Sequence, residues 1–377
     1  MEQHMQKQHN RSRAILSVLT CAFLGALLLS GCSLGSTGIT PTHPSAIGPQ
    51  GAAPTAGVSQ TQQGEGAAQL QTFQQWIGLM QQYGGSVKTY QQQYSSDQQA
   101  LNSANTATDY DKALGALQGH VKAIKIPTMR QESTNLQQKL TQDVNGWGAQ
   151  HTYTDSYNGV TYHKGYQYDN RTGIGGSLWL QGDLSAAQSL ADYQQIVENL
   201  NMWIYLFQQM KSNSNSKTAY NQVHQSDLSI LKHFGYTSGP VIVVSLGEEA
   251  LRAYQDGKLV KAFQVTTGQP DLPTPPGTWW IEGKKHPTVF KSTEPKSSPN
   301  WYPDTPITYA MQYHSNGYYL HDAWWRTQFG PGTNFPHQDP DGNVFATHGS
   351  HGCVNMSTSD AAWLYGFVSV FTPLVMY

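Results

Sequence analysis

Residues 241–267, VIVVSLGEEALRAYQDGKLVKAFQVTT, decide the fold of the C-terminal part of this 377-residue chain. Val241 to Leu246 is an apolar run rich in β-branched residues, which favour strands. Two further strand-like runs follow, and Asp256-Gly257 lies between them. Asp-Gly between two such runs predicts a tight β-hairpin. The spacing of the apolar residues therefore changes from the helical period to that of an extended strand near Gly239-Pro240.

Downstream of this hairpin, short apolar runs alternate with Gly- and Pro-rich turns. The strand-like runs are Thr278–Ile281, Ile307–Gln312, Tyr318–His321 and Thr372–Tyr377. Many short strands separated by such turns are typical of a mostly β domain. We predict one over residues 238–377, a length within the usual range for a single domain.

Upstream, apolar residues recur at helical spacing and predict a mainly helical, bundle-like domain over residues 66–237, whose role the sequence does not indicate. Helices are expected from about Ala67 to the break at Gly84-Gly85, from a cap at Asp109 to a stop at Pro127, over 128–144, over 185–210 with capping-box spacing at Ser185 and Gln188, and over 221–233. The predicted fold class is thus a multidomain α + β protein, helical first and mostly β second.

The stretch from Trp147 to Trp179 differs from the helices around it. It carries five tyrosines among Gly and Asn, which predicts a hairpin or long loop packed on the helices. The alternative is a surface that contacts sugar rings through the aromatic faces.

The first 65 residues have the composition of a leader and a tether. A basic start, an apolar core from Ala14 to Ser30 and the run Leu29-Ser30-Gly31-Cys32 resemble a bacterial lipoprotein signal. We therefore expect a signal peptide over 1–31, lipidation of Cys32, a flexible Ser/Thr/Pro/Gly/Gln linker over 32–65, and a lipid-anchored location in the extracytoplasmic cell envelope. Ordinary secretion or an uncleaved membrane anchor are the alternatives.

Charge and cysteine content reduce the number of function classes that fit this protein. The formal net charge is −2, with 22 basic and 24 acidic residues and no basic cluster. This argues against a nucleic-acid partner, because neutralising phosphates needs clustered Lys and Arg. Of three cysteines, two lie in the leader, so Cys353 has no disulfide partner in the body of the chain. Cys353 is therefore a candidate reactive thiol. We expect the protein to be monomeric.

Cys353 lies in the sequence Ser350-His351-Gly352-Cys353-Val354-Asn355. A thiol nucleophile needs a neighbouring base or cation that increases its thiolate fraction. His321, at the end of a predicted strand, is a candidate for that base. Gly352 allows a tight turn, and backbone N–H groups around Cys353 could stabilise an oxyanion.

This motif resembles the signature of the L,D-transpeptidase (YkuD-type) catalytic domain. The resemblance extends over about residues 240–377 and includes Leu320-His321-Asp322-Ala323, the opening hairpin, Thr267-Gly268 and the turn Pro273–Thr278. It implies that Cys353 is the nucleophile and His321 the general base and later acid. It also implies that His351 and Gly352 shape the nucleophile turn, and that Ser350 orients this loop.

The implied reaction is acyl transfer on peptidoglycan stem peptides, giving 3–3 cross-links, with no metal or organic cofactor. The family is also acylated by carbapenems. The same thiol could instead act as an L,D-carboxypeptidase or attach proteins to the wall, and the sequence leaves these alternatives open. A non-catalytic envelope lipoprotein that only binds peptidoglycan is the alternative of another class.

The segment between His321 and Cys353 is longer than in the compact form of the family. It carries Trp324 and Trp325, which together with Tyr313 could form a flap beside the substrate. It also carries His348, a rival candidate for the base. The cluster of His314, His321, His348 and His351 lacks the spacing of a zinc motif, so no metal site is predicted.

Overall fold

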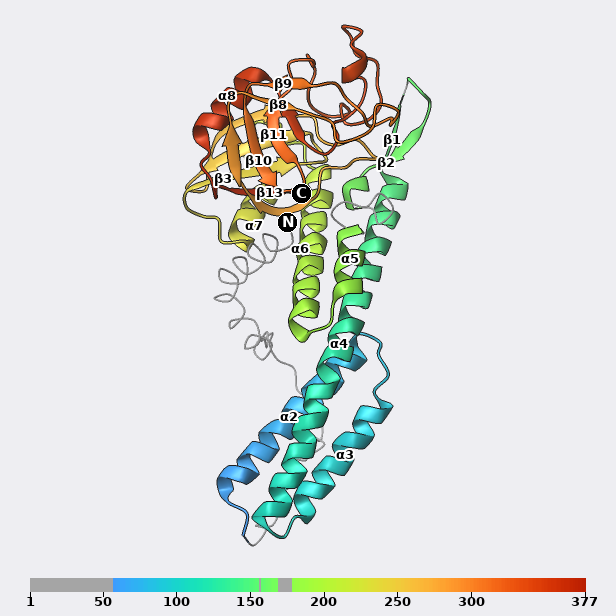
Figure 1. Cartoon of the computed structure of the whole chain (residues 1–377), viewed down its shortest axis with the longest axis vertical. Helices are drawn as coiled ribbons and strands as arrows, with labels where there is room; N and C mark the ends of the chain where they lie inside the picture. The colour runs from blue at the N-terminus through green and yellow to red at the C-terminus, as the bar shows by residue number, and fades with distance from the viewer. Residues whose placement is uncertain (1–56, 156, 169–177) are drawn as a thin grey trace, which may run out of the picture. The chain divides into compact units, whose positions relative to one another are not determined.

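The computed structural model describes residues 57–155, 157–168 and 178–377 (Figure 1). The predicted signal peptide, the lipidation site at Cys32 and the first part of the linker lie outside the described residues. Within the described residues, no helix is both long and apolar enough to cross a bilayer.

Six helices make up the N-terminal region of the described chain: α2 (Gln60–Gln82), α3 (Lys88–Ser103), α4 (Ala107–Gln150), α5 (Leu178–Ala186), α6 (Leu190–Ser214) and α7 (Gln225–His233). The first begins inside the stretch that we expected to be linker. Ser59 forms a capping box with Gln62, which satisfies two backbone donors at the start of α2. The helical region therefore begins earlier than residue 66.

Helix α4 corrects the expectation that Pro127 ends a helix. It runs without interruption for 44 residues and includes Pro127. A proline inside a helix lacks the N–H that would bond to the carbonyl of Ala123. Packing on both sides of Pro127 offsets this loss, because buried residues continue from Ile124 to Thr128 and Met129. At the start of the helix, Thr106 is the cap and accepts a hydrogen bond from the Asp109 N–H.

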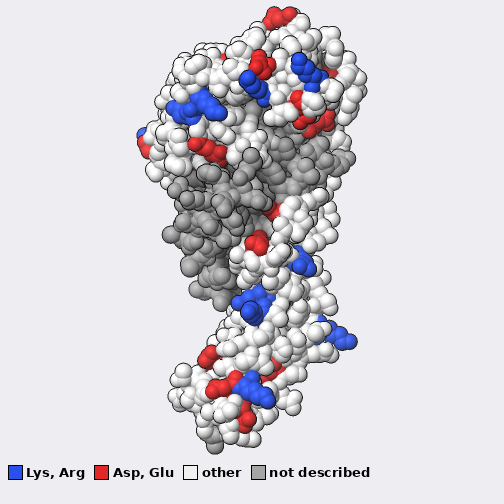
Figure 2. All heavy atoms as spheres, viewed as in Figure 1, with Lys and Arg blue, Asp and Glu red and all other residues white. Residues whose placement is uncertain are grey.

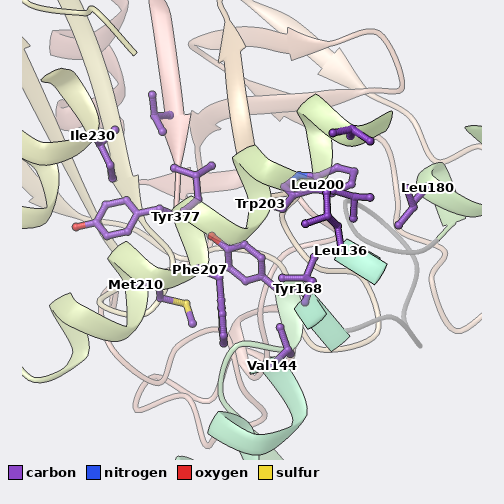
Figure 3. Close-up of a cluster of buried hydrophobic side chains, with 14 of the residues drawn as sticks. Leu136, Val144, Tyr168, Leu180, Leu200, Trp203, Phe207, Met210, Ile230 and Tyr377 are labelled. Atoms are coloured by element: carbon purple, nitrogen blue, oxygen red, sulfur yellow. The ribbon is translucent and has the colours of Figure 1, made fainter. Parts of the chain in front are cut away.

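Two separate hydrophobic cores use the two halves of α4. The first half, up to Ile124, packs with α2 and α3. The second half, from Met129 onward, packs with α6 in a cluster that also includes Ile230 of α7 and Tyr377 of the C-terminal domain (Figure 3). The boundary between the two cores therefore falls at Pro127.

The start of α6 also differs from the expectation. The predicted capping box at Ser185 and Gln188 does not form, because Ser185 lies inside α5. Ser189 and Asp192 form the capping box of α6 instead. Both pairs have the required spacing, and the longer apolar stripe behind Ser189 distinguishes the pair that forms.

The C-terminal region folds as two packed sheets, which confirms the mostly β expectation. The larger sheet has the order β5-β4-β3-β13-β6 and contains β3 (Pro240–Ser245), β4 (Ala250–Gln255), β5 (Lys258–Gln264), β6 (Gly277–Trp280) and β13 (Pro373–Met376). The smaller has the order β12-β11-β10-β7 and contains β7 (Gly283–Lys285), β10 (Ala310–His314), β11 (Tyr318–Asp322) and β12 (Val354–Met356). A ribbon of β8 (Thr288–Phe290) and β9 (Thr305–Ile307), the short helix η2 (Val344–Ala346) and helix α8 (Thr358–Phe367) complete the domain.

The hairpin quoted at the outset forms as predicted. Strands β4 and β5 pair antiparallel around Asp256-Gly257, both of which have positive φ, 53° and 73°. This is the backbone that a two-residue type I′ turn requires. One hydrophobic core, with residues from both sheets and α8, lies between the sheets.

The tyrosine-rich segment forms the hairpin β1 (Thr152–Thr154) and β2 (Thr161–His163), followed by the short helix η1 (Tyr166–Tyr168). We expected it to pack on the helices, and Tyr168 does contact Phe207 of α6. Tyr153, however, stacks on Phe335 of the C-terminal domain at 4.5 Å between ring centroids. The segment therefore packs against both regions.

A buried polar network joins α7 to the larger sheet. The Arg252 guanidinium on β4, fully buried, donates to both carboxylate oxygens of Asp227 on α7. The hydroxyls of Tyr254 and Tyr377 also donate to Asp227, at 2.6 and 2.7 Å. Each charged group is thus hydrogen-bonded, which a buried ion pair needs. At the surface, acidic and basic side chains are interspersed on the face shown in Figure 2.

Candidate active site

A cavity of about 460 Å³ lies beside the smaller sheet and contains most of the predicted site residues. Cys353, His321, Ser350, His351, His348, Trp324 and Trp325 all line it, together with aromatic residues of the β8–β9 region such as Trp301 and Tyr302. Tyr313 does not belong to this wall. Its ring is buried in the core, and its hydroxyl donates to the Gly352 carbonyl at 3.2 Å. Tyr313 therefore supports the loop from behind and is not a flap residue.

Parallel pairing of β11 and β12 brings two distant parts of the sequence together. His321 on β11 lies opposite Asn355 on β12, and Cys353 directly precedes β12. The His321 ring is almost completely buried. Its Nδ1 is 2.9 Å from the Asp322 carbonyl oxygen, and its Nε2 is 3.0 Å from the Asn355 side-chain nitrogen.

The Cys353 thiol is half-buried and has its own partners. Its Sγ lies 3.7 Å from the Gly317 carbonyl oxygen, to which the thiol donates. Burial raises the pKa of the thiol to about 11, although the Tyr319 backbone N–H opposes this shift. Burial also lowers the pKa of His321 to about 4. Thiol and imidazole are therefore both neutral near pH 7, in one cavity, and each is hydrogen-bonded to other described groups.

The loop before Cys353 is held by hydrogen bonds to its own backbone and to a distant threonine. Ser350 Oγ accepts from the Gly352 N–H at 3.1 Å and donates to the Cys353 carbonyl. The Thr274 hydroxyl donates to the Gly352 carbonyl at 2.9 Å. Gly352 has φ +103°, and a Cβ there would lie 2.5 Å from Cε1 of Tyr318. These contacts hold the loop in place; the supporting role of Ser350 and Gly352 in the reaction stays a prediction, and Thr274 joins them as a residue that contacts the loop.

A second support was not visible in the sequence. The buried Glu249 carboxylate accepts from the Thr267 backbone N–H and from its hydroxyl, at 2.5 and 2.6 Å. The Thr267 carbonyl in turn accepts from the Ser350 N–H at 2.9 Å. Burial raises the pKa of Glu249 to about 8. Glu249 lies about a hundred residues from Ser350 in sequence, so only the folded chain reveals this connection.

The other histidines of the site have different partners. His348, the rival base, lines the same cavity, and its Nδ1 is 3.0 Å from the Thr347 hydroxyl. Burial lowers its pKa, and Arg326 lowers it further. His351 packs near Tyr302 at 5.6 Å between ring centroids. Among the residues that the structure describes, no three His, Cys, Asp or Glu side chains gather in a way that could hold a metal ion.

Comparison with known proteins agrees with this geometry. Residues 239–376 match the sequence profile of the YkuD family, the L,D-transpeptidase catalytic domain. The C-terminal region thus resembles the L,D-transpeptidase catalytic domain, and it follows a helical N-terminal region, as the sequence predicted. The profile covers little more than a third of the chain.

Individual relatives resemble the same part of the chain. L,D-transpeptidase 1 of Mycobacterium tuberculosis is 27% identical over 145 residues, which are 37% of this chain and 52% of that protein. Probable L,D-transpeptidase 3 of the same species is 30% identical over 145 residues, 38% of this chain and 46% of that protein. The NMR structure of the catalytic domain from the E. faecium L,D-transpeptidase is 27% identical and covers 38% of this chain and 100% of that domain, with a TM-score of 0.31. The chain spans about half the length of the curated relatives it matches.

Proposed function

We propose that this protein is a cysteine-dependent L,D-transpeptidase that forms 3–3 cross-links between peptidoglycan stem peptides. The observation that carries the proposal is the placement of Cys353 and His321 in one cavity of a domain that matches the L,D-transpeptidase catalytic domain. The two curated relatives described above are named L,D-transpeptidases, which supports the activity, and the stem-peptide substrate is part of the proposal.

The first half-reaction transfers an acyl group to Cys353. The sulfur attacks the carbonyl carbon of the third residue of a tetrapeptide stem, and the thiol proton goes to a neutral histidine, for which we propose His321. The bond to the terminal D-alanine breaks, and the histidine returns the proton to the departing amine. A thioester with Cys353 remains. In the loop Ser350–Cys353 the N–H groups of Ser350 and Gly352 donate to Thr267 and to the Ser350 hydroxyl, so we expect those of His351 and Cys353 to stabilise the oxyanion.

The second half-reaction resolves the thioester. An amine of a neighbouring stem attacks the thioester carbonyl, gives up a proton to the histidine, and displaces the Cys353 sulfur, which takes that proton back. An amide cross-link forms and the thiol is restored. The aromatic side chains of Trp301, Trp324 and Trp325 form one wall of the cavity in which we propose that the stem binds.

Proton transfer must accompany the attack in this scheme. A thiol with a pKa of about 11 is almost entirely protonated at pH 7. A histidine with a pKa of about 4 is almost entirely neutral and available as a base. The resting pair is therefore not a preformed thiolate and imidazolium, and the substrate meets a thiol that loses its proton as the new bond forms.

The first experiment is intact mass of the full-length protein after incubation with a carbapenem, which acylates an active thiol without knowledge of the native stem. We expect one covalent adduct on the wild type and none on Cys353→Ala. His321→Ala should react at least 100-fold more slowly, whereas His348→Ala should react at a rate close to that of the wild type. A folded wild type without an adduct would contradict the proposal, and the opposite ranking of the two histidine variants would overturn the base assignment.

Product analysis with purified muropeptides then distinguishes three possible reactions of the Cys353 thiol: cross-linking, hydrolysis and protein attachment. Cross-linked dimers support the transpeptidase. Shortened stems without dimers would identify an L,D-carboxypeptidase, and a protein–stem conjugate would identify protein attachment.

We further propose a lipid anchor at Cys32 that keeps the enzyme in the extracytoplasmic envelope. Metabolic labelling with a fatty acid should mark the wild type and leave Cys32→Ala unmarked.

A further inference from the structure

His321 is the last but one member of a chain of hydrogen bonds that begins at Arg326. The Arg326 side chain is buried and its Nε lies 3.2 Å from Asn355 Oδ1. The Asn355 amide nitrogen lies 3.0 Å from His321 Nε2. His321 Nδ1 lies 2.9 Å from the Asp322 carbonyl oxygen. Four groups thus form one chain: three of them lie on the neighbouring strands β11 and β12, and Arg326 lies in the loop after β11.

The two ends of this chain determine its direction. A guanidinium can only donate, so Asn355 must present its oxygen to Arg326 and its NH₂ group to His321. A backbone carbonyl can only accept, so His321 must carry its proton on Nδ1. In a neutral ring Nε2 then has a free lone pair, and this lone pair accepts from the Asn355 amide. Both ends therefore require the same tautomer of His321.

We infer that Arg326 and Asn355 are positioning residues that hold His321 as the neutral tautomer protonated on Nδ1, with Nε2 basic. The inference rests on the proposed function only in that His321 is the base. A proton on Nε2 would place two N–H donors face to face. Rotation of the Asn355 amide cannot relieve this contact without turning its NH₂ group toward Arg326. The Nε2 lone pair rests on the Asn355 amide, so His321 must exchange this hydrogen bond for one from the thiol before it takes the thiol proton.

The charges around His321 act in the same direction. Burial is the main cause of its low pKa, the Arg326 charge lowers it further, and Asp322 opposes both. Cys353, His348, His351, Asp304 and Tyr302 are the other titratable residues that line the cavity besides Arg326. Removing the Arg326 charge therefore raises the pKa of His321 toward the ordinary value of about 6.5.

Arg326 also touches the loop before Cys353, so the experiment must separate two roles. Its Nη2 donates to the His348 carbonyl at 2.6 Å. Asn355→Leu removes the amide and keeps these loop contacts of Arg326. Asn343→Ala is the matched loop control, because Asn343 donates to the Trp325 carbonyl at 2.8 Å and takes no part in the chain.

The readout is the pH dependence of carbapenem acylation by full-length protein, measured as rates at pH 5.5 and 7.5. With a low His321 pKa the wild type should lose little rate at pH 5.5. Arg326→Met and Asn355→Leu should lose more rate, about twofold, because burial still lowers the pKa of His321 in both variants and only the smaller contribution of the Arg326 charge or of the Asn355 hydrogen bond is removed. The double variant should lose no more than the worse single variant. Asn343→Ala should keep the ratio of the wild type.

A second measurement does not depend on activity. In full-length protein labelled with ¹⁵N-histidine, the His321 signals, assigned by their loss in His321→Gln, should report a protonated Nδ1 and an unprotonated Nε2 at pH 7. Asn355→Leu should show a mixture of tautomers. Protonated Nε2 in the wild type, or additive losses in the double variant, would overturn the inference. A wild type that shows the predicted tautomer but forms no adduct would refute the proposed function and leave the inference standing.

Discussion

The Cys353 thiol shows how burial at a single residue sets reactivity. Its raised pKa, about 11, means that roughly one molecule in ten thousand carries a thiolate at pH 7. We predict that alkylation of Cys353 by iodoacetamide is slow at pH 7 and becomes about tenfold faster with each pH unit up to pH 10. Mass spectrometry of the labelled peptide measures this rate. A plateau below pH 8 would show that the thiol is already ionised, and the concerted proton transfer would then be wrong.

Gly352 is the second residue whose backbone the site depends on. Its φ of +103° is rarely open to other residues, and an added Cβ would collide with the Tyr318 ring. Gly352→Ala should lower the free energy of unfolding by about 1–3 kcal/mol and reduce carbapenem acylation at least tenfold. Gly349 and Gly352 lie in the same loop, but Gly366, which has open space around it, is the matched control. Gly366→Ala should leave acylation unchanged.

For single residues, the sequence predicted those that line the active-site cavity. It did not predict the buried residues whose hydrogen bonds keep the cavity residues in place. Cys353, His321 and Ser350 were recognisable because they lie in short motifs. Glu249, Thr274 and Arg326 act through contacts with residues 18–78 positions away, and single polar residues of these types are common at surfaces. Their burial becomes visible only when the strands pair.

Helix α4 gives a prediction at the scale of one element. The Pro127 ring is exposed, so its replacement removes no packing, while a new N–H can bond to the Ala123 carbonyl. Pro127→Ala should raise the free energy of unfolding by about 1–3 kcal/mol, measured by urea denaturation followed by circular dichroism. Gly119→Ala, at another exposed position of α4, adds no hydrogen bond and should gain about 1 kcal/mol at most. An equal gain in the two variants would mean that the missing bond costs nothing here.

The elements that sequence predicted best are those with a strong period or a specific turn. The β4–β5 hairpin was visible from Asp256-Gly257, and α6 from its apolar stripe. Helix α3 was missed because its sequence is almost entirely polar and buries only Asp97 and Leu101. Such a helix is stabilised by its neighbours, and its own pattern does not reveal it.

Across the whole molecule, the Asp227–Arg252 pair links the helical region to the sheet. Asp227→Ala leaves the buried Arg252 charge without its main partner and should lower the free energy of unfolding by about 3–5 kcal/mol. Asp227→Asn keeps the size and some hydrogen bonds and should cost less. Exposed Asp111→Ala is the control and should change stability by less than 0.5 kcal/mol. Thermal unfolding of the three variants tests the ranking, and equal melting temperatures for Asp227→Ala and Asp111→Ala would contradict it.

The β1–β2 hairpin links the helical region to the segment between His321 and Cys353. Phe335 is buried against Tyr153, Tyr162 and Tyr166, and the Tyr166 hydroxyl also bonds to Asn334 at 2.8 Å. Phe335→Ala should lower the local stability of residues 324–349 by about 3 kcal/mol, which amounts to roughly 100-fold faster hydrogen exchange there. Phe371→Ala, at a 71% exposed side chain, should leave this exchange unchanged. Equal exchange in both variants would mean that the hairpin does not support the segment.

The placement of Pro127 between two cores also has a mechanical consequence. A continuous α-helix of 44 residues is about 66 Å long and behaves as a stiff rod. Its least stiff point is Pro127, where a backbone hydrogen bond is missing and the helix is bridged by Trp76 and Tyr83 from the C-terminal end of α2. A lateral force on α2, α3 and the first half of α4 would therefore bend α4 near Pro127 before it deformed the cavity that contains Cys353 and His321.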